Sequence, residues 1–210
     1  MLQLGPIMRD PILRQFPLCD PTAVMAAAAR GLSGADPHSE RLVVELGNVP
    51  VEGFPKTLVD RVVSGVSLRS QFVDKCVESE VESGTRQIIV LGSGLDTLAW
   101  RLSWPSGCTL WALDRPGTAG VASQALGAPS SVELVDVEAD LADTDWMGRL
   151  DLAGVDWDQP VVFVAEALLL YLPSDTAHQI MAMSSSRSVP GSSFVYTYPV
   201  SYTHLRAHET

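Results

Sequence analysis

Two glycines and one aspartate have the types and spacing that suit binding of a nucleoside. Gly92 and Gly94 follow the short apolar run Gln87–Leu91, and Asp114 ends a second apolar run twenty positions after Gly94. Glycines at the end of a strand permit a tight turn and a close approach of a ligand to the backbone. A carboxylate after the next strand can accept hydrogen bonds from both ribose hydroxyls. Singly, these residues also fit a plain turn and a helix N-cap; in this order they favour a nucleoside cofactor.

Position 97 distinguishes between two kinds of nucleoside cofactor. The dinucleotide fingerprint G-x-G-x-x-G requires glycine there for close helix–strand packing beside a pyrophosphate, and the sequence has Thr97. Asp96 adds a carboxylate near the loop, which is unfavourable for a diphosphate. S-adenosyl-L-methionine has a cationic sulfonium and no phosphate, so an acidic lining attracts it. The loop therefore favours S-adenosyl-L-methionine over a nicotinamide dinucleotide.

Further carboxylates follow two later apolar runs. Val132–Val137 is followed by an acidic stretch that includes Asp140, and Val161–Ala165 is followed directly by Glu166. In open α/β sheets, ligands bind outside the carboxyl ends of the strands. We therefore expect both carboxylates to lie near the same ligand as Asp114.

No pair of side chains has the pattern of a nucleophile and its general base. The motif G-x-S-x-G is absent, and neither His38 nor His178 has an evident partner, so no catalytic residue is predicted. The three cysteines (Cys19, Cys76 and Cys108) are widely spaced and form neither a zinc pattern nor a disulfide framework. No metal is therefore expected, and a cytoplasmic, reducing location is favoured.

Length and composition are those of one globular domain. The 210 residues are 46% hydrophobic, which is enough to bury one substantial core. A net charge of −11 disfavours nucleic acid as a partner, because an acidic surface repels phosphate backbones. No apolar run approaches the roughly 18 residues that a membrane span needs, and the first residues lack the apolar region of a secretory signal.

The candidate ligand-binding residues require a sheet that brings strand ends together. Strands are expected at Gln87–Leu91, Thr109–Leu113, Val132–Val137, Val161–Ala165 and Ser193–Tyr198. Helices are expected at Thr22–Leu32, Lys56–Val81 (which Gly65 can divide in two), Thr97–Leu102 and Thr176–Ser185, with chain breaks at Gly34–Pro37 and Asn48–Pro55. Strands that alternate with helices predict an α/β fold, a Rossmann-like parallel sheet with helices on both faces.

The motifs resemble those of a known family. Arg86–Leu102 (RQIIVLGSGLDTLAWRL) resembles the signature of the leucine carboxyl methyltransferase-like family of S-adenosyl-L-methionine-dependent methyltransferases, and the resemblance continues through Leu113–Pro116, Ala139–Leu141, Val164–Pro173 and, upstream, the arginine-containing helix Ser67–Asp74. It implies a class I methyltransferase sheet. It also implies an irregular segment 1–21 and a methyltransferase domain 22–199, with a helical part 22–85 and a core 86–199.

The resemblance assigns three residues to the methionine part of the cofactor. Arg69 is expected to pair with its carboxylate, where the guanidinium fork is well suited. Gly92 is expected to lie against the methionine part and Glu166 near its amino group, while Gly94 is expected to bind the cofactor as the second glycine of the turn.

The nucleoside part is assigned to three residues by the same resemblance. Asp114 is expected to hold the ribose, and Asp140 and Leu141 to border the adenine. Two departures from the family pattern stand out. A lysine that leucine carboxyl methyltransferases proper use near the cofactor has no counterpart in Thr22–Arg30, and Ser93 replaces the usual alanine.

The function that these residues imply is O-methylation of a carboxylate or small molecule, the acceptor being either a small molecule or a protein C-terminal carboxylate. Tyr171 is a candidate to orient that acceptor and equally fits a packed aromatic at a helix start. Two alternatives stay open: a nicotinamide-dependent oxidoreductase on a similar sheet, and a non-catalytic interaction domain that retains the fold. The oligomeric state is not predicted.

The last residues differ in character from those before them. The run Val200–Thr210 resembles one reading frame of a transposase adapter joined to a broken open reading frame, so 200–210 is expected to be a non-native tail. The histidines His204 and His208 are therefore not considered as ligands. The native protein is expected to continue beyond Pro199, and this chain to be an N-terminal fragment of it.

Overall fold

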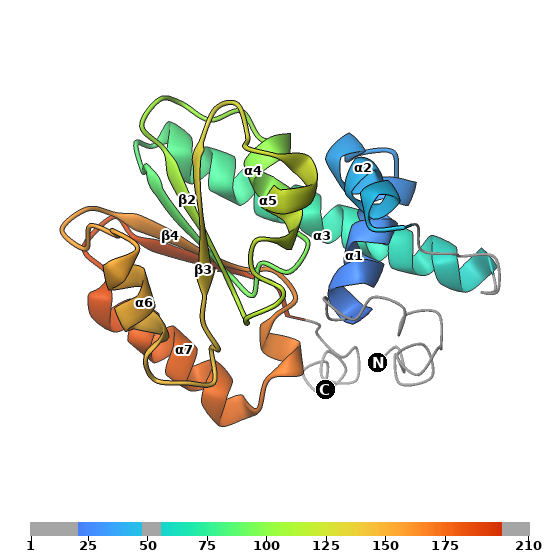
Figure 1. Cartoon of the computed structure of the whole chain (residues 1–210). Coiled ribbons are helices and arrows are strands. Elements are labelled where there is room, and N and C mark those ends of the chain that lie inside the picture. The colour runs from blue at the N-terminus through green and yellow to red at the C-terminus, as the bar shows by residue number, and fades with distance from the viewer. Residues whose placement is uncertain (1–20, 48–55, 199–210) are drawn as a thin grey trace, which may run out of the picture.

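A five-stranded parallel sheet forms the centre of the protein (Figure 1). A computed structural model describes residues 21–47 and 56–198. The strands are β1 (Gln87–Leu91), β2 (Thr109–Asp114), β3 (Glu133–Glu138), β4 (Val161–Ala165) and β5 (Ser193–Tyr196), in the order β3-β2-β1-β4-β5. All neighbouring pairs are parallel. The five predicted strands are thus confirmed. Because β2 and β4 lie on opposite sides of β1, the strand order reverses at β1, where a ligand crevice is expected.

Helices fill most of the remaining described chain. They are α1 (Pro21–Leu32), α2 (Pro37–Glu45), α3 (Lys56–Glu82), α4 (Leu98–Arg101), α5 (Val121–Leu126), α6 (Trp146–Leu152) and α7 (Ser174–Arg187), with a short 3₁₀ turn at Leu169–Tyr171. Helix α3 continues through Gly65, so the division considered from sequence does not occur. The break at Gly34–Pro37 also differs from expectation, because Pro37 begins α2, and its N-cap Asp36 accepts hydrogen bonds from His38 N and Ser39 N.

Both faces of the sheet are covered, as predicted. On one face, Val73, Val77 and Val81 recur at four-residue steps along α3 and pack with the β1 residues Ile88 and Val90. Successive strand residues point to opposite faces. The intervening residues of β1 therefore belong to a second core, with α6 and α7, which Figure 1 shows together on one side of the sheet.

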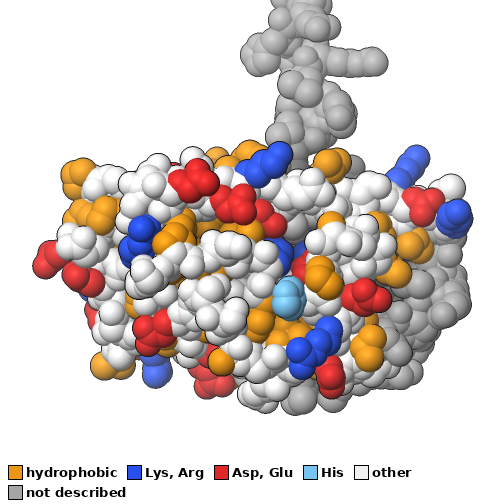
Figure 2. All heavy atoms as spheres, turned by 90° about the horizontal axis from the view of Figure 1, so that it is seen from above, with side chains coloured by type: hydrophobic (Ala, Val, Ile, Leu, Met, Phe, Trp, Pro, Cys, Tyr) orange, Lys and Arg blue, Asp and Glu red, His pale blue; other side chains and the backbone are white. Residues whose placement is uncertain are grey.

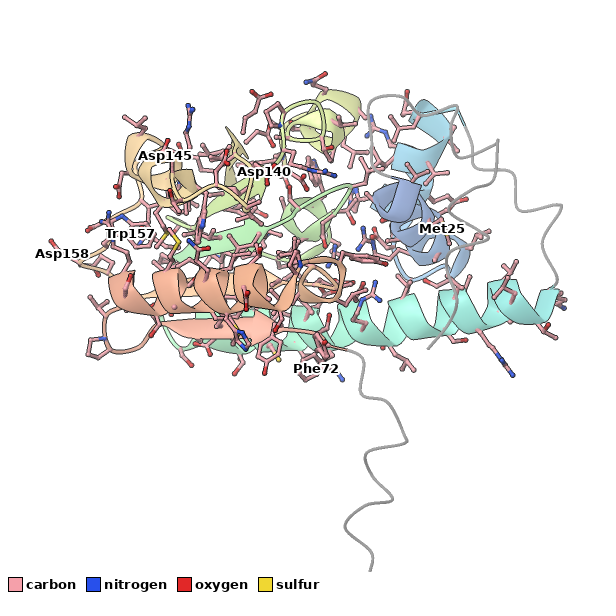
Figure 3. The ribbon with its side chains drawn as sticks, turned by 90° about the horizontal axis from the view of Figure 1, so that it is seen from below. Met25, Phe72, Asp140, Asp145, Trp157 and Asp158 are labelled. Atoms are coloured by element: carbon pink, nitrogen blue, oxygen red, sulfur yellow. The ribbon has the colours of Figure 1, made fainter. Side chains whose placement is uncertain are left out.

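Helices α1 and α2 form a pair that packs beside the loop after β1. Val24 and Ala27 of α1, Leu42 of α2, and Leu95 of that loop share a third apolar cluster, which also includes residues of α5. Figure 3 shows Met25 on α1, away from Asp140 on the loop after β3. This packing makes α1 a wall at one side of the strand ends.

The surface is mixed in character. Acidic, basic and apolar side chains are interspersed over the face seen in Figure 2. Within the described ranges, no helix combines the length and apolar character that crossing a membrane requires. The predictions for residues 1–20, for the chain break at Asn48–Pro55 and for the segment 200–210 lie outside the described residues.

Candidate functional site

A cavity of about 560 Å³ opens at the carboxyl ends of the strands. All of the cofactor-binding residues predicted from sequence line it: Arg69, Gly92, Gly94, Asp114, Asp140, Leu141 and Glu166. They come from α3, from the last residue of β2 and from the segments that follow β1, β3 and β4. The parallel sheet therefore brings together residues that are separated by up to 97 positions.

The turn after β1 requires glycine at its first position. Gly92 has φ +62°, a conformation that side chains rarely adopt, and a Cβ built on it lies 2.6 Å from Cδ1 of Leu168. Gly94 also has a positive φ, of +54°. The turn and the segment after β4 are consequently in direct contact, with a bare backbone facing the cavity between them.

Asp114 holds this turn in place through its carboxylate. Its Oδ2 accepts a hydrogen bond from Gly94 N at 2.6 Å, and its Oδ1 accepts one from Arg115 N at 2.7 Å. Each carboxylate oxygen has a second lone pair. The carboxylate can therefore fix the loop and also accept ligand hydroxyls.

The loop after β3 contributes one polar and one apolar residue. Asp140 is exposed, and its Oδ1 accepts from Ala142 N at 2.9 Å in a local turn. Leu141 is buried and belongs to the same apolar core as Ile89 and Leu91 of β1. A carboxylate next to an apolar side chain is the combination expected around a flat, amine-bearing base.

Glu166 has one well-bound oxygen and one without a partner. Its Oε1 accepts from Arg69 Nε and from Ser70 Oγ, both at 2.9 Å, and lies 3.8 Å from Arg30 Nη1. Its Oε2 is buried and makes no hydrogen bond to any described residue. A buried carboxylate oxygen without a donor is costly. The geometry thus leaves a place for a cationic donor in the cavity.

Arg30 is a site residue that sequence reasoning missed. Its side chain is 5% exposed, and it donates to Leu95 O at 2.9 Å and pairs with Asp96 Oδ2 at 3.4 Å. A signal for it exists in the sequence, because Arg30 is the one charged residue in the alanine-rich segment Pro21–Leu32. This helix has no lysine, and the guanidinium of Arg30 lies in the cavity wall instead.

Asp96 is part of a buried charge network below the loop. Arg101 donates to Asp96 Oδ1 at 2.6 Å, and its fork also binds both oxygens of Asp74 on α3 at 2.8–3.0 Å. Burial opposes ionisation of Asp96, but Arg101 and Arg30 outweigh it and lower the pKa of this carboxyl to about 2. Burial raises the pKa of Asp74 despite the same arginine. Two guanidiniums thus pair with Asp96 and compensate its charge within the network.

Thr97 has a structural role where the dinucleotide fingerprint has glycine. Its side chain is fully buried, and its hydroxyl donates to Asp36 Oδ2 at 2.5 Å. Asp36 in turn accepts from Ser39 Oγ at 2.6 Å. The loop after β1 is therefore joined to α2 by hydrogen bonds in place of the close glycine packing of a dinucleotide site.

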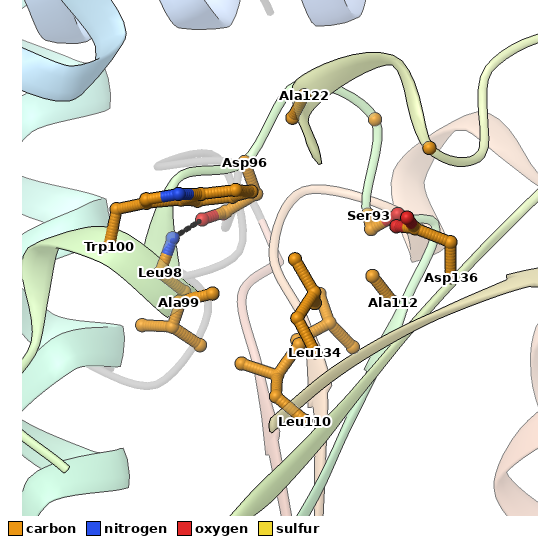
Figure 4. Close-up of a pocket in the computed structure, with 13 residues that line it drawn as sticks. Ser93, Asp96, Leu98, Ala99, Trp100, Leu110, Ala112, Ala122, Leu134 and Asp136 are labelled. Carbon is orange, nitrogen blue, oxygen red and sulfur yellow. Dashed lines mark hydrogen bonds between the residues drawn. The ribbon is translucent and has the colours of Figure 1, made fainter. Parts of the chain in front are cut away.

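A second, smaller pocket lies beneath the loop, on the α4 side (Figure 4). It is mainly apolar, and Asp96, which lines it, accepts a hydrogen bond at its Oδ1 from the backbone N of Leu98, the first residue of α4, at 2.7 Å. Its volume of about 20 Å³ has room for roughly one water molecule. Of these two pockets, the larger has the volume that a ligand needs.

The cavity wall also contains an aromatic side chain. Tyr171 lines it and is 47% exposed. Among the residues that the structure describes, no group of three or more His, Cys, Asp or Glu is placed to hold a metal ion.

The fold is shared with two solved structures. A "putative methyltransferase" from Thermobifida fusca YX aligns over 77% of this chain and 66% of that chain, with a TM-score of 0.57 and 19% identity. A DUF574 family protein from Streptomyces avermitilis MA-4680 aligns over 62% of this chain and 53% of that chain, with a TM-score of 0.54 and 20% identity. The sheet order and these neighbours define the fold as a Rossmann-like α/β fold.

The family follows from the sequence match. Residues 18–185 match the leucine carboxyl methyltransferase family, and the chain belongs to this family. Relatives from Mycobacteroides abscessus and Mycolicibacterium gilvum are 35% and 31% identical over 83% and 84% of this chain, and both carry the name "putative S-adenosyl-L-methionine-dependent methyltransferase". The chain spans 65% of the length of each relative. The names of both relatives give S-adenosyl-L-methionine as the cofactor of those proteins.

Proposed function

We propose that the protein is an S-adenosyl-L-methionine-dependent methyltransferase that methylates an oxygen of a carboxylate or small molecule. The observation that carries this proposal is the orphaned Oε2 of Glu166, buried in a cavity that Arg30, Arg69 and Asp114 also line. An α-amino acid end combines an ammonium with a carboxylate. It therefore satisfies an unpartnered carboxylate oxygen and two guanidiniums at once.

The methionine end of the cofactor is assigned to the α1, α3 and β4 side of the cavity. Glu166 Oε2 would accept from its ammonium group. Arg69 uses Nε for Glu166, so its terminal nitrogens remain donors for the cofactor carboxylate. Arg30 adds a second positive charge 3.8 Å from the same glutamate and supplies the role for which sequence reasoning sought a lysine.

The nucleoside end is assigned to the segments after β2 and β3. Asp114 would accept from the ribose hydroxyls while it keeps its bond to Gly94 N. Asp140 and Leu141 would border the adenine, the first as an acceptor for the exocyclic amine and the second as an apolar contact. Gly92 lines the cavity, and because it has no Cβ, Leu168 can pack against the β1 turn that the cofactor is proposed to contact.

The chemistry needs little from the chain beyond position. When bound, the cofactor supplies a methyl group already activated on a sulfonium. The contribution of the chain is to hold the reacting groups in attack geometry and to exclude water. A carboxylate acceptor is ionised at neutral pH and needs no general base, which agrees with a site where no catalytic residue is assigned.

Direct titration tests this function. Calorimetry of the protein with S-adenosyl-L-methionine is expected to give one site with micromolar affinity, and NADH is expected not to bind. Transfer of a labelled methyl group to carboxylate-bearing compounds or C-terminal peptides then tests the reaction. NADH binding without S-adenosyl-L-methionine binding would replace the proposal by an oxidoreductase. Cofactor binding without transfer to any acceptor would instead support a non-catalytic interaction domain.

Location and partners are part of the same proposal. Cys76 and Cys108 are both free thiols, which supports a reducing, cytoplasmic location. The partner is proposed to be a small molecule or a protein C-terminal carboxylate. The acidic net charge of −11 argues against nucleic acid.

A further inference from the structure

The backbone directly after Glu166 has an unusual conformation. Ala167 has φ +54° and, among the residues that the structure describes, is the one non-glycine with a positive φ. Its Cβ makes this left-handed conformation less favourable than it is for glycine. Such a conformation persists only when surrounding contacts hold it, and it concentrates at functional sites. The contacts that hold Ala167 are therefore part of how the site is built.

Thr197 makes hydrogen bonds to both neighbours of Glu166. Its Oγ1 accepts from Ala167 N at 2.8 Å, and its backbone N donates to Ala165 O at 3.3 Å. The paired register of β4 and β5 ends with Ala165 opposite Tyr196. Thr197 thus lies just beyond the ladder, and its hydroxyl bond adds to the sheet pairing.

The result of this arrangement is a fixed direction for the Glu166 side chain. From one side, Ser70 and Arg69 bind its Oε1. From the backbone side, Thr197 holds the peptide unit between Glu166 and Ala167. The Oε2 atom of Glu166 is left without a partner in the cavity. If Ala167 relaxed to a negative φ, the turn from Glu166 to Leu168 would change, and the carboxylate would move with it.

We propose that Thr197 is a positioning residue for ligand binding: its hydroxyl holds Ala167 in the left-handed conformation and thereby keeps Glu166 Oε2 directed at a cationic group of the ligand. This inference rests on the proposed function, because that group is the ammonium of S-adenosyl-L-methionine. Thr197 itself is not assigned a contact with the cofactor.

Substitutions at Thr197 separate the hydroxyl from the shape of the side chain. Thr197→Val keeps the volume and removes the acceptor, whereas Thr197→Ser keeps the acceptor. The dissociation constant for S-adenosyl-L-methionine, measured by calorimetry, is expected to rise about five- to tenfold in Thr197→Val. It is expected to stay within about twofold of the parent in Thr197→Ser and in Thr144→Val, an exposed control.

A second substitution tests the backbone itself. Ala167→Gly removes the Cβ that makes a positive φ unfavourable, so the left-handed conformation no longer needs the hydrogen bond from Thr197. The double variant Ala167→Gly with Thr197→Val is expected to bind within about threefold of the parent. Equal affinity of Thr197→Val and parent would overturn the proposal. So would a Thr197→Ser variant as weak as Thr197→Val, or a double variant no tighter than Thr197→Val alone.

Crystal structures of the ligand-free parent and Thr197→Val distinguish this inference from the proposed function. The positioning role predicts that Ala167 leaves the left-handed region and that Glu166 moves in the variant. An unchanged Ala167 and Glu166 in that structure would overturn the role, whether or not the cofactor binds. A parent that does not bind S-adenosyl-L-methionine in the calorimeter would overturn the proposed function instead, and the two structures would still decide the positioning role.

Discussion

Arg69 Nε and Glu166 Oε1 lie 2.9 Å apart and form an ion pair across 97 positions of sequence. The pair joins the middle of α3 to the end of β4, the strand next to β1 in the sheet. Glu166 is 6% exposed whereas Arg69 is 27% exposed. The glutamate is therefore the fixed member of the pair, and the arginine presents its outer nitrogens to the cavity.

The first prediction concerns the charge of this glutamate. Glu166→Gln keeps the size of the side chain and an oxygen that can accept from Ser70 and Arg69, but it removes the negative charge offered to an ammonium. We expect the dissociation constant for S-adenosyl-L-methionine to rise about 10- to 100-fold, because hydrogen bonds between charged groups contribute about 1.5–3 kcal/mol. Calorimetry measures this directly. S-adenosyl-L-homocysteine provides a control, since it keeps the ammonium and should lose the same factor.

A second prediction concerns the ribose and the methionine carboxylate. Asp114→Ala removes the acceptor of the ribose hydroxyls and the bond to Gly94 N, so we expect about a 100-fold or greater loss of affinity for S-adenosyl-L-methionine. Arg69→Ala is expected to weaken binding less, since Arg30 remains. Asp143→Ala, at an exposed carboxylate outside the cavity, is the matched control. Wild-type affinity in both site variants would contradict the assignment.

Two glycines that differ in surroundings give the third prediction. Gly92→Ala places a Cβ 2.6 Å from Leu168 Cδ1 at φ +62°, and we expect the free energy of unfolding to fall by about 1–2 kcal/mol. Gly65→Ala adds a Cβ in open space within α3 and should raise the same quantity by about 0.5–1 kcal/mol. Urea unfolding followed by circular dichroism measures both. A loss of equal size in the two variants would show that the Leu168 contact is not the cause.

The sheet and its strand-end residues could be predicted because their signals are local. Each buried strand is a short apolar run, and β1 and β4 have the boundaries expected from sequence. A parallel sheet then places the residue after each strand at one edge. Gly92, Asp114 and Glu166 therefore line one cavity, as their positions at the strand ends predict.

What the sequence did not reveal depends on contacts between distant residues. Helices α5 and α6 have six and seven residues, too few for a periodic pattern to identify. Helix α2 was missed because Asp36 and Pro37, an N-cap followed by a first helical residue, also fit a chain break. The role of Arg30 is visible only when α1 lies against the loop that contains Leu95.

The last prediction concerns acid stability and the network around Asp96. The pKa of Asp96 is lowered from 3.8 to about 2 in the folded protein, because Arg101 and Arg30 outweigh the effect of burial. A lowered folded pKa contributes stability that is fully present above about pH 4 and is lost as the pH falls toward 2. A difference of nearly two pKa units corresponds to about 2 kcal/mol.

Asp74, with its pKa raised by burial, acts in the opposite direction in acid, so the comparison must isolate Asp96. We therefore expect the unfolding free energy of the parent to fall between pH 4 and pH 2 by about 2 kcal/mol more than that of Asp96→Asn, in urea titrations at each pH. Asp143→Asn, an exposed carboxylate outside the network, is the control and should follow the parent. Parallel curves for the parent and Asp96→Asn would mean that the arginines do not hold this carboxylate ionised, and that the loop after β1 is fixed by its backbone bonds alone.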